Sequence, residues 1–378
     1  MVLYFSQRWL FGPLIPELMA EFHLDKTQIG VLGSASVWGY MAMPIIAGFL
    51  SDRFNRKYIT LIGIFGFSGL AMICGVVTTS QQLFIVRLLT GGAEAFFFVP
   101  LLAYMLDLFP ERPGFYLTLM SSGSSLGWFT GPALAGWLLE LSSSWRVPFL
   151  VVGLIGLIVA SFLFYFWPGE KRTHRPGGFF AKDILKPLNI LMLLLLSAVA
   201  AFQISAEFGF TMWYPAILEL EFSMTAAAAG ALTGLYGMGQ LVGRPVMGWV
   251  CDKLTYRLVG VISGLLLGTS FVFILVVHST ALRALLTLEA GFIGAGVMGA
   301  LWTFTGLIFP SFRGLALGVI TSLGYASASL SLILIGYLGD RYALSTGLRA
   351  VCIPATFLAA LAFLSTYLLK SMKLRENR

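Results

Sequence analysis

The sequence predicts an all-α membrane protein in which twelve transmembrane helices form two pseudo-symmetric six-helix bundles. Three observations predict this fold class: charged residues are scarce, apolar runs recur at the length of a bilayer, and the landmarks of the first half return in the second. A soluble domain would need a far more charged surface than this chain can supply.

Composition separates the chain from soluble globular proteins. Of its 378 residues, 58% are hydrophobic and only 11% are charged, whereas soluble domains contain roughly 25% charged residues. The 42 glycines suit the close helix packing that small residues permit in lipid. Basic loops on one side of a membrane explain the net charge of +7, so we expect a lipid bilayer and no nucleic acid as partner.

Twelve apolar runs, separated by short polar turns, are long enough to cross a bilayer. Because the runs do not alternate as barrel strands do, each is predicted to be a helix. The predicted spans are 1–21, 28–50, 58–78, 81–108, 113–140, 147–168, 186–219, 224–252, 257–278, 281–309, 313–339 and 346–370.

The distribution of Lys and Arg predicts the orientation. Sixteen of these residues fall in one set of loops and the C-terminal tail, and five fall in the opposite loops. Since basic loops remain in the cytoplasm, both termini are predicted to be cytoplasmic. Short outer loops favour a prokaryotic cytoplasmic (inner) membrane, and we expect a monomer.

The longest polar stretch divides the chain. Residues 169–185 are basic and contain Pro and Gly, as expected of a cytoplasmic linker. The predicted domains are therefore an N-terminal bundle, 1–168, and a C-terminal bundle, 186–378.

An offset of 200 residues superposes the two halves. Glu21-Phe22 corresponds to Glu221-Phe222, Gly39 to Gly239, and Phe109-Pro110 to Phe309-Pro310. An even number of spans separates the copies, so the two halves are predicted to run parallel.

The segment Gly48-Phe49-Leu50-Ser51-Asp52-Arg53-Phe54-Asn55-Arg56-Lys57 resembles the signature loop of the major facilitator superfamily. Gly248 to Lys253, which includes Asp252, resembles a weaker copy. The resemblance implies the major facilitator fold, with a substrate path between the halves and alternating access. We predict that Asp52 with Arg53 and Arg56 latches the cytoplasmic side, and that Gly48 and Asp252 belong to this gate; the other interpretation is solvated loop charges.

A narrower resemblance is to the anion:cation symporter family. It rests on Arg8 in the first helix, on the element from Arg87 to Glu94 in the fourth, on Trp145-Arg146, and on Trp213-Tyr214-Pro215. The chain departs from that family at two places. Gln7 stands where an aspartate often precedes the arginine, and the seventh helix offers Gln203 and Glu207 where some relatives have a second arginine.

Charges within spans are costly in lipid, so they are expected to face a cavity or a partner. We predict that Arg8 binds a substrate carboxylate, that Glu94 carries a coupled proton, and that Arg87 tunes it, with Glu207 as a further coupling residue. The alternative is a structural Arg87–Glu94 pair. For Arg244, the alternative to a functional role is snorkelling toward the cytoplasmic surface.

Four further side chains are predicted to bind substrate. Tyr214 and Tyr236 carry phenol hydroxyls that need partners within a span. Gln203 and Gln240 complete the set. No catalytic residue, cofactor or metal ligand is predicted, because the chain shows neither His, Asp or Cys at metal-ligand spacing nor a nucleotide-binding loop.

These features predict a secondary transporter, and favour proton-coupled symport of a small organic anion. Gly127, Gly131-Pro132 and Gly136 in the fifth helix support the alternative, a proton-driven antiporter that exports a drug, sugar or metabolite. The same glycines also suit close helix packing and a kink. The sequence leaves open import or export, and coupling to protons or sodium.

Overall fold

The computed structural model describes the backbone of residues 1–108, 113–167, 187–309 and 313–376. Helices and short turns account for these residues, with no strand among them. The predicted linker, 169–185, lies outside the described residues.

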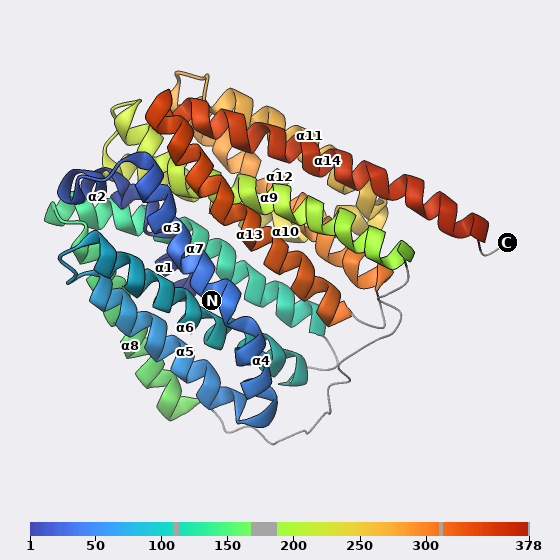
Figure 1. The fold of residues 1–378 in the computed structure, drawn as a ribbon, viewed down its shortest axis with the longest axis horizontal. Coiled ribbons are helices and arrows are strands. Elements are labelled where there is room, and N and C mark those ends of the chain that lie inside the picture. The colour runs from blue at the N-terminus through green and yellow to red at the C-terminus, as the bar shows by residue number, and fades with distance from the viewer. Residues whose placement is uncertain (109–112, 168–186, 310–312, 377–378) are drawn as a thin grey trace. The chain divides into compact units, whose positions relative to one another are not determined.

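The helices of the first half begin almost at the first residue (Figure 1). Proline interrupts two of the predicted spans, because it lacks the backbone N–H and crowds the preceding turn. Pro13 lies in the short 3₁₀ turn after α1, and Pro44 begins α4. The elements are α1 (Val2–Trp9), η1 (Gly12–Leu14), α2 (Ile15–Phe22), α3 (Lys26–Ala42), α4 (Pro44–Arg53), α5 (Arg56–Cys74), α6 (Ser80–Leu108), α7 (Pro113–Ser142) and α8 (Arg146–Phe166).

The described part of the second half contains six helices. These are α9 (Pro187–Leu220), α10 (Ala226–Lys253), α11 (Tyr256–Ile274), α12 (Thr280–Ile308), α13 (Arg313–Arg341) and α14 (Leu344–Glu376). With each interrupted span counted once, the described chain contains twelve helical segments, as the fold class predicts. Nine described helices are long and apolar enough to cross a membrane by themselves.

The described chain forms two compact units. The first contains α1 to α8 together with residues 214–234, and the second contains residues 187–213 and the chain from 235 onward. In the first unit, α5 packs against α6 and α8, while α1 packs against α7. In the second unit, α11 packs against α12 and α14.

The two units repeat one another at the predicted offset. Helices α5 and α11 both contain 19 residues and begin at positions 56 and 256. The closest helix contacts repeat as well: Gly39 lies against the backbone of Leu88, and Gly239 lies against the backbone of Leu288. A side chain at either glycine would overlap that backbone, so both positions require glycine for the close approach.

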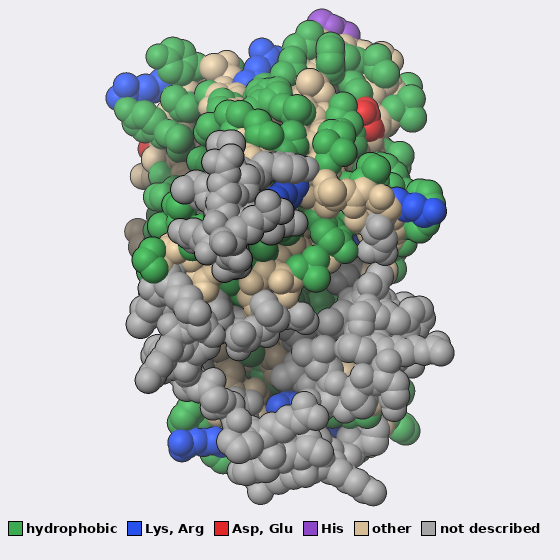
Figure 2. All heavy atoms as spheres, turned by 90° about the vertical axis from the view of Figure 1, so that its right-hand side faces the viewer, with side chains coloured by type: hydrophobic (Ala, Val, Ile, Leu, Met, Phe, Trp, Pro, Cys, Tyr) green, Lys and Arg blue, Asp and Glu red, His purple; other side chains and the backbone are tan. Residues whose placement is uncertain are grey.

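The surface is suited to lipid. Hydrophobic side chains make up most of the coloured surface in Figure 2, and charged side chains are scattered. Large apolar side chains face outward along several helices, including Phe166 at 70% and Leu330 at 67% exposure. Such exposure would be costly in water, but costs little in a hydrocarbon environment.

Candidate functional site

The first unit encloses a buried ion pair between α1 and α6. Arg8 Nη1 lies 3.1 Å from Glu94 Oε2, and the two side chains are 3% and 2% exposed. Charges this deep in a membrane helix require a partner, because either one alone would be left uncompensated. The structure therefore brings together the residues predicted to bind substrate and to carry the proton.

Two tyrosines hold the guanidinium of Arg8. Arg8 Nη1 also donates a hydrogen bond to the Tyr4 hydroxyl, at 2.7 Å. On another side, Arg8 Cζ lies 5.2 Å from the centre of the Tyr40 ring, within the range of a cation–π contact. The Tyr4 ring is fixed in turn by an edge contact with Phe67 and a tilted contact with Phe97. An apolar cluster thus positions the charged group.

Arg87 donates hydrogen bonds to α3, and no hydrogen bond or ion pair between Arg87 and Glu94 is described. Its Nε donates to the Leu32 carbonyl at 3.2 Å, and its Nη2 donates to Gly33 O at 3.4 Å. Its guanidinium also lies 3.9 Å from the centre of the Phe11 ring. The described residues thus show no Arg87–Glu94 ion pair, and the tuning of Glu94 by Arg87 stays a prediction. Two helical turns put both residues on one face, but separate them by about 10 Å along the axis, and Arg8 reaches Glu94 instead.

A small cavity adjoins the ion pair. Its volume is about 10 Å³, which is close to the least space that holds one water molecule. Gln7 donates to the Phe67 carbonyl at 2.8 Å, whereas its buried Oε1 has no hydrogen-bond partner among the described residues. The cavity is thus polar enough for a water. Its lining residues are Gln7, Arg8, Ser36, Ala71, Cys74, Arg87, Thr90, Glu94 and Phe149.

Three small polar residues of this site, Ser36, Cys74 and Thr90, are not predicted by the sequence. Hydroxyl side chains within helices commonly bond to their own backbone, as Thr90 does to the Val86 carbonyl at 2.7 Å. A single sequence therefore does not show that such residues belong to a site, whereas a charged residue within an apolar run does indicate one.

The second unit holds another buried carboxylate, Glu207 on α9. Glu207 Oε1 accepts hydrogen bonds from Gln203 Nε2 at 3.1 Å and from the Tyr236 hydroxyl at 3.2 Å. On α10, one turn beyond Tyr236, Gln240 Oε1 accepts a hydrogen bond from Arg244 Nη2 at 2.9 Å. Three predicted residues, Gln203, Glu207 and Tyr236, thus form one cluster with Gln240 beside it.

The remaining predicted substrate residue is Tyr214. It is fully buried in the segment of α9 that belongs to the first unit. Its role in binding stays a prediction.

The predicted cytoplasmic gate is described only in part. The side chains of Asp52 and Asp252 lie outside the described residues. Arg53 lies over the Phe49 ring with its Cζ 4.0 Å from the ring centre, and Lys253 repeats this contact over Trp249 at 5.3 Å.

The other gate positions are ordinary parts of their helices. Arg56 begins α5, whose N-cap is Asn55. A side chain at Gly48 would meet Val99 at 3.8 Å, which is ordinary contact. The latch itself stays a prediction.

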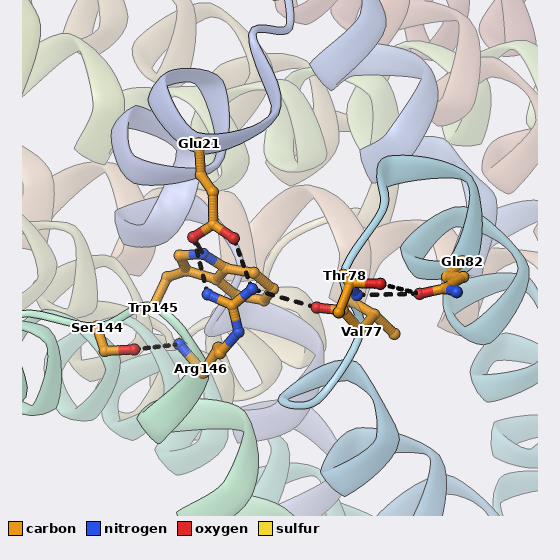
Figure 3. A network of polar contacts seen from close by, with 7 residues as sticks. All are labelled: Glu21, Val77, Thr78, Gln82, Ser144, Trp145 and Arg146. Carbon is orange, nitrogen blue, oxygen red and sulfur yellow. Dashed lines mark hydrogen bonds and ion pairs between the residues drawn. The ribbon is translucent and has the colours of Figure 1, made fainter.

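A polar clamp joins the ends of three segments on the predicted outer side (Figure 3). Glu21 at the end of α2 accepts hydrogen bonds from Trp145 Nε1 at 2.7 Å and from both terminal nitrogens of Arg146, at 2.8 and 2.5 Å. Arg146 also donates to the Val77 carbonyl at 3.2 Å. The hydrogen bonds from Arg146 hold the pKa of the Glu21 carboxyl below its usual value.

The glycines of α7 are packing positions on two faces. Gly127 lies against the Phe5 side chain and the Val2 carbonyl of α1, Gly131 lies against the backbone of Ser6, and Gly136 lies against the backbone of Ala226. Close packing, one of the two interpretations of this element, is therefore present within the first unit.

Comparisons with known proteins agree with this architecture. The model of the Major Facilitator Superfamily matches residues 1–332. A gallate transporter of Pseudomonas putida is 26% identical over 83% of this chain and 77% of its own length. Multidrug resistance protein 1 of Bacillus subtilis is 29% identical over 82% of this chain and 81% of its own.

A solved structure shares the fold. A bacterial homolog of the human lysosomal transporter Spinster, in an inward-facing and occupied conformation, has a TM-score of 0.77 at 17% identity, covering 99% of this chain and 94% of its own. The family match, the twelve helical segments and the repeated units lead to one conclusion: the chain belongs to the Major Facilitator Superfamily, and is a secondary transporter rather than an enzyme.

Proposed function

We propose that the protein is a proton-coupled symporter of a small organic anion, a carboxylate, working by alternating access in a prokaryotic cytoplasmic membrane. The observation that carries the proposal is the buried Arg8–Glu94 ion pair beside a small polar cavity. The similarity to a gallate transporter supports this substrate class, because gallate is an aromatic carboxylate.

Coupling follows from competition for one arginine. A substrate carboxylate that pairs with Arg8 deprives Glu94 of its counter-ion. An uncompensated buried carboxylate costs several kcal/mol, so Glu94 takes up a proton as the substrate binds. Release of the substrate reverses both events. The empty carrier then returns with Arg8 and Glu94 paired and neutral overall.

Two aromatic side chains beside Arg8 favour the proposal that the substrate is aromatic or otherwise planar. The Tyr4 hydroxyl lies at the same Arg8 nitrogen that the carboxylate would approach, and Tyr40 presents its ring to the Arg8 guanidinium. A planar anion bound to Arg8 would lie within reach of both rings. Arg87 lines the same cavity as Glu94 and also holds α3 beside it, so it is placed to tune Glu94 through its charge.

Transport into proteoliposomes tests the proposal. Purified protein should accumulate radiolabelled gallate, or another carboxylate from a panel, when the outside is more acidic than the lumen. Glu94→Gln should abolish this net uptake, because an empty carrier with Arg8 uncompensated cannot return. The variant should retain exchange of external for internal substrate, since the loaded carrier is unchanged in charge.

Glu219→Gln is the matched control, because it removes another partly buried carboxylate from a membrane helix. It should leave net uptake unchanged. Accumulation of substrate by Glu94→Gln at the wild-type level would contradict the proposal.

Proton-driven export of a drug or metabolite is the second candidate. It is supported by the similarity to Multidrug resistance protein 1 and by the Gly131-Pro132 element of α7. A pH-sensitive dye in the lumen separates the two candidates. Symport acidifies the lumen as substrate enters, whereas antiport makes the lumen more alkaline as substrate enters.

A further inference from the structure

Glu207 is a buried carboxylate whose described hydrogen bonds all come from neutral donors. The residue is 5% exposed. Gln203 and Tyr236 both donate to its Oε1, while no hydrogen bond to Oε2 and no ion pair to either oxygen is described. The buried Oε1 of Gln203 also has no hydrogen-bond partner among the described residues. An anion in such surroundings is far costlier than a neutral acid.

The Glu207 carboxylate lies beside the residue that the 200-residue repeat matches to Glu94. The counterpart of Glu94 in the second unit is Gly294, and the counterpart of Gln7 is Glu207. A Cβ atom built on Gly294 would lie 3.4 Å from Glu207 Oε1 and 2.6 Å from the Tyr236 hydroxyl. Each unit therefore places one acid between its first and fourth helices, from α6 in the first unit and from α9 in the second.

The groups around Glu207 include one cation, Arg244 of α10. Tyr236 and Arg244 lie on the same face of α10, eight residues apart, with Gln240 between them. Arg244 is hydrogen-bonded to Gln240 in this structure. From α12, Gly294 contributes no side chain, and the α14 thiol of Cys352 lies toward the Ala206 carbonyl at 3.5 Å. Arg244 is thus the one described cation near enough to serve as an alternative counter-ion.

Building on the symport proposed above, we infer that Glu207, with Gln203 and Tyr236, forms a second proton-binding site, so that each substrate anion crosses the membrane with two protons. In the loaded carrier, the substrate pairs with Arg8, and both Glu94 and Glu207 carry a proton. In the returning carrier, Glu94 pairs with Arg8, and Glu207 has released its proton and pairs with Arg244 after Arg244 leaves Gln240.

This cycle balances in charge and predicts an electrogenic transporter. A monovalent anion with two protons carries one net positive charge inward. Without Glu207, the anion crosses with one proton and the transported cargo is neutral. The two schemes therefore differ in their response to membrane voltage, and not only in rate.

Equilibrium accumulation of radiolabelled gallate in proteoliposomes measures the difference. The wild-type protein should accumulate substrate about a hundredfold per pH unit, and about tenfold more for each ~59 mV of inside-negative potential set with potassium and valinomycin. Glu207→Gln should accumulate substrate about tenfold per pH unit, without response to voltage. Glu207→Asp should restore the voltage response, and Glu219→Gln should behave as wild type.

Three results would overturn the inference. The first is wild-type uptake that follows the pH gradient but does not respond to voltage. The second is a Glu207→Gln protein that keeps the voltage response, and the third is a Glu219→Gln protein that loses it. If no carboxylate is taken up in response to the pH gradient, the proposed symport itself is wrong, and this outcome differs from the three results that concern Glu207.

A second measurement does not require an active variant. Dicyclohexylcarbodiimide, an apolar reagent, modifies protonated carboxyl groups in membrane proteins. Mass spectrometry of the wild-type protein treated at neutral pH should find Glu207 modified and Glu94, which is paired with Arg8, unmodified. An unmodified Glu207 would contradict the second proton site even if Glu207→Gln were too unstable for transport assays.

Discussion

The residues that bind Arg8 are expected to differ in what they contribute to transport. Glu94 contributes charge, whereas Tyr4 contributes one hydrogen bond and an aromatic wall. A substitution of Glu94 should therefore change the coupling of transport to protons, whereas a substitution of Tyr4 should change the affinity for the substrate.

Tyr4→Phe removes the hydroxyl that Arg8 contacts at 2.7 Å, but keeps the ring among Phe67 and Phe97. A hydrogen bond to a charged group contributes about 1.5–3 kcal/mol. We expect the KM for the transported carboxylate to rise about tenfold or more, with the proton dependence unchanged. Tyr58→Phe, at an exposed tyrosine on α5, is the control. A Tyr4→Phe protein that transports normally but loses its pH dependence would show that the hydroxyl belongs to the proton path.

Arg8→Lys tests the geometry of the same site. Lysine keeps the charge but lacks the planar fork that contacts Tyr4 and Glu94 together. We expect substrate affinity to fall by at least about tenfold, while Glu94 retains a counter-ion. Competition by unlabelled carboxylates in the exchange assay measures this loss. Unchanged affinity would mean that a point charge suffices.

Much of this residue-level picture could be predicted from the sequence, because an isolated charge in an apolar run carries a strong signal. Arg8, Glu94 and Glu207 stand out for that reason. The choice of partner could not be predicted, since position along one helix does not show which neighbouring helix approaches. Glu94 pairs with Arg8 from α1 and not with Arg87 of its own helix, and Ser36 carries no signal in the sequence.

At the scale of helices, contact depends on glycines at a few crossing points. Gly39 touches the backbone of Leu88, and the equivalent contact recurs at Gly239. Gly39→Ala should force α3 and α6 apart, since overpacking of this kind costs about 1–3 kcal/mol. Thermal unfolding in detergent should show a lower Tm.

Gly69→Ala is the matched control for that measurement. Gly69 lies in α5, and a methyl group added there would have no neighbouring atom within 4 Å. The substitution should keep or slightly raise the Tm, because alanine favours helix. Equal destabilisation by the two substitutions would show that helix propensity, and not the α3–α6 contact, sets the effect.

The clamp of Glu21, Trp145 and Arg146 joins α2 to α8 and should make stability depend on pH. The pKa of Glu21 is lowered in the folded protein by the hydrogen bonds from Arg146. Its contribution is therefore present above the unfolded pKa and is lost as the pH falls through the folded pKa. Because the Glu21 side chain is 39% exposed, the contribution is small, of the order of an exposed ion pair.

Glu21→Gln should lower the Tm by a few degrees at most at neutral pH. The difference from wild type should disappear in acid, below the pKa of the folded carboxyl. Gln82→Ala, at a side chain that bonds only to Thr78 nearby among the described residues, is the control. A difference that persists in acid would assign the effect to packing against Trp145.

The boundaries of the helices could largely be predicted from apolar runs and turns. The predicted spans 58–78 and 281–309 correspond to α5 and α12 within several residues. The interruptions at Pro13 and Pro44 could not be predicted as breaks, because many membrane helices continue through proline, as α6 does at Pro100.

At the scale of the whole molecule, transport requires the predicted cytoplasmic gate to open and close. We propose that Asp52 latches this gate. Asp52→Asn should then lower the maximal transport rate severalfold while the KM changes little, because the loss falls on a conformational step. Asp25→Asn, at the N-cap of α3 on the predicted outer side, is the control. A lower rate that comes only with a higher KM would place Asp52 in binding instead.

The duplication is visible in the sequence from matched glycines and Phe-Pro pairs, and the structure repeats the Gly39–Leu88 contact at Gly239 and Leu288. The repeat predicts equivalent backbones, but it does not predict equivalent chemistry. Counting from Glu94 leads to Gly294, which bears no acid. Only the approach of the Glu207 carboxylate to Gly294 on α12 reveals that Glu207 fills the corresponding place.

The placement of this acid on α9 rather than on α12 has a consequence for how such a carrier can be altered. A duplicated bundle offers two anchoring points, on facing helices, for a single ionisable group. A protein with both Glu207→Gln and Gly294→Glu would carry its acid on α12 instead of α9, with the Tyr236 hydroxyl displaced from its place 2.6 Å from the new Cβ atom. The number of protons carried with each substrate would thus depend on which of two helices holds the acid, or on whether either does, within one backbone fold.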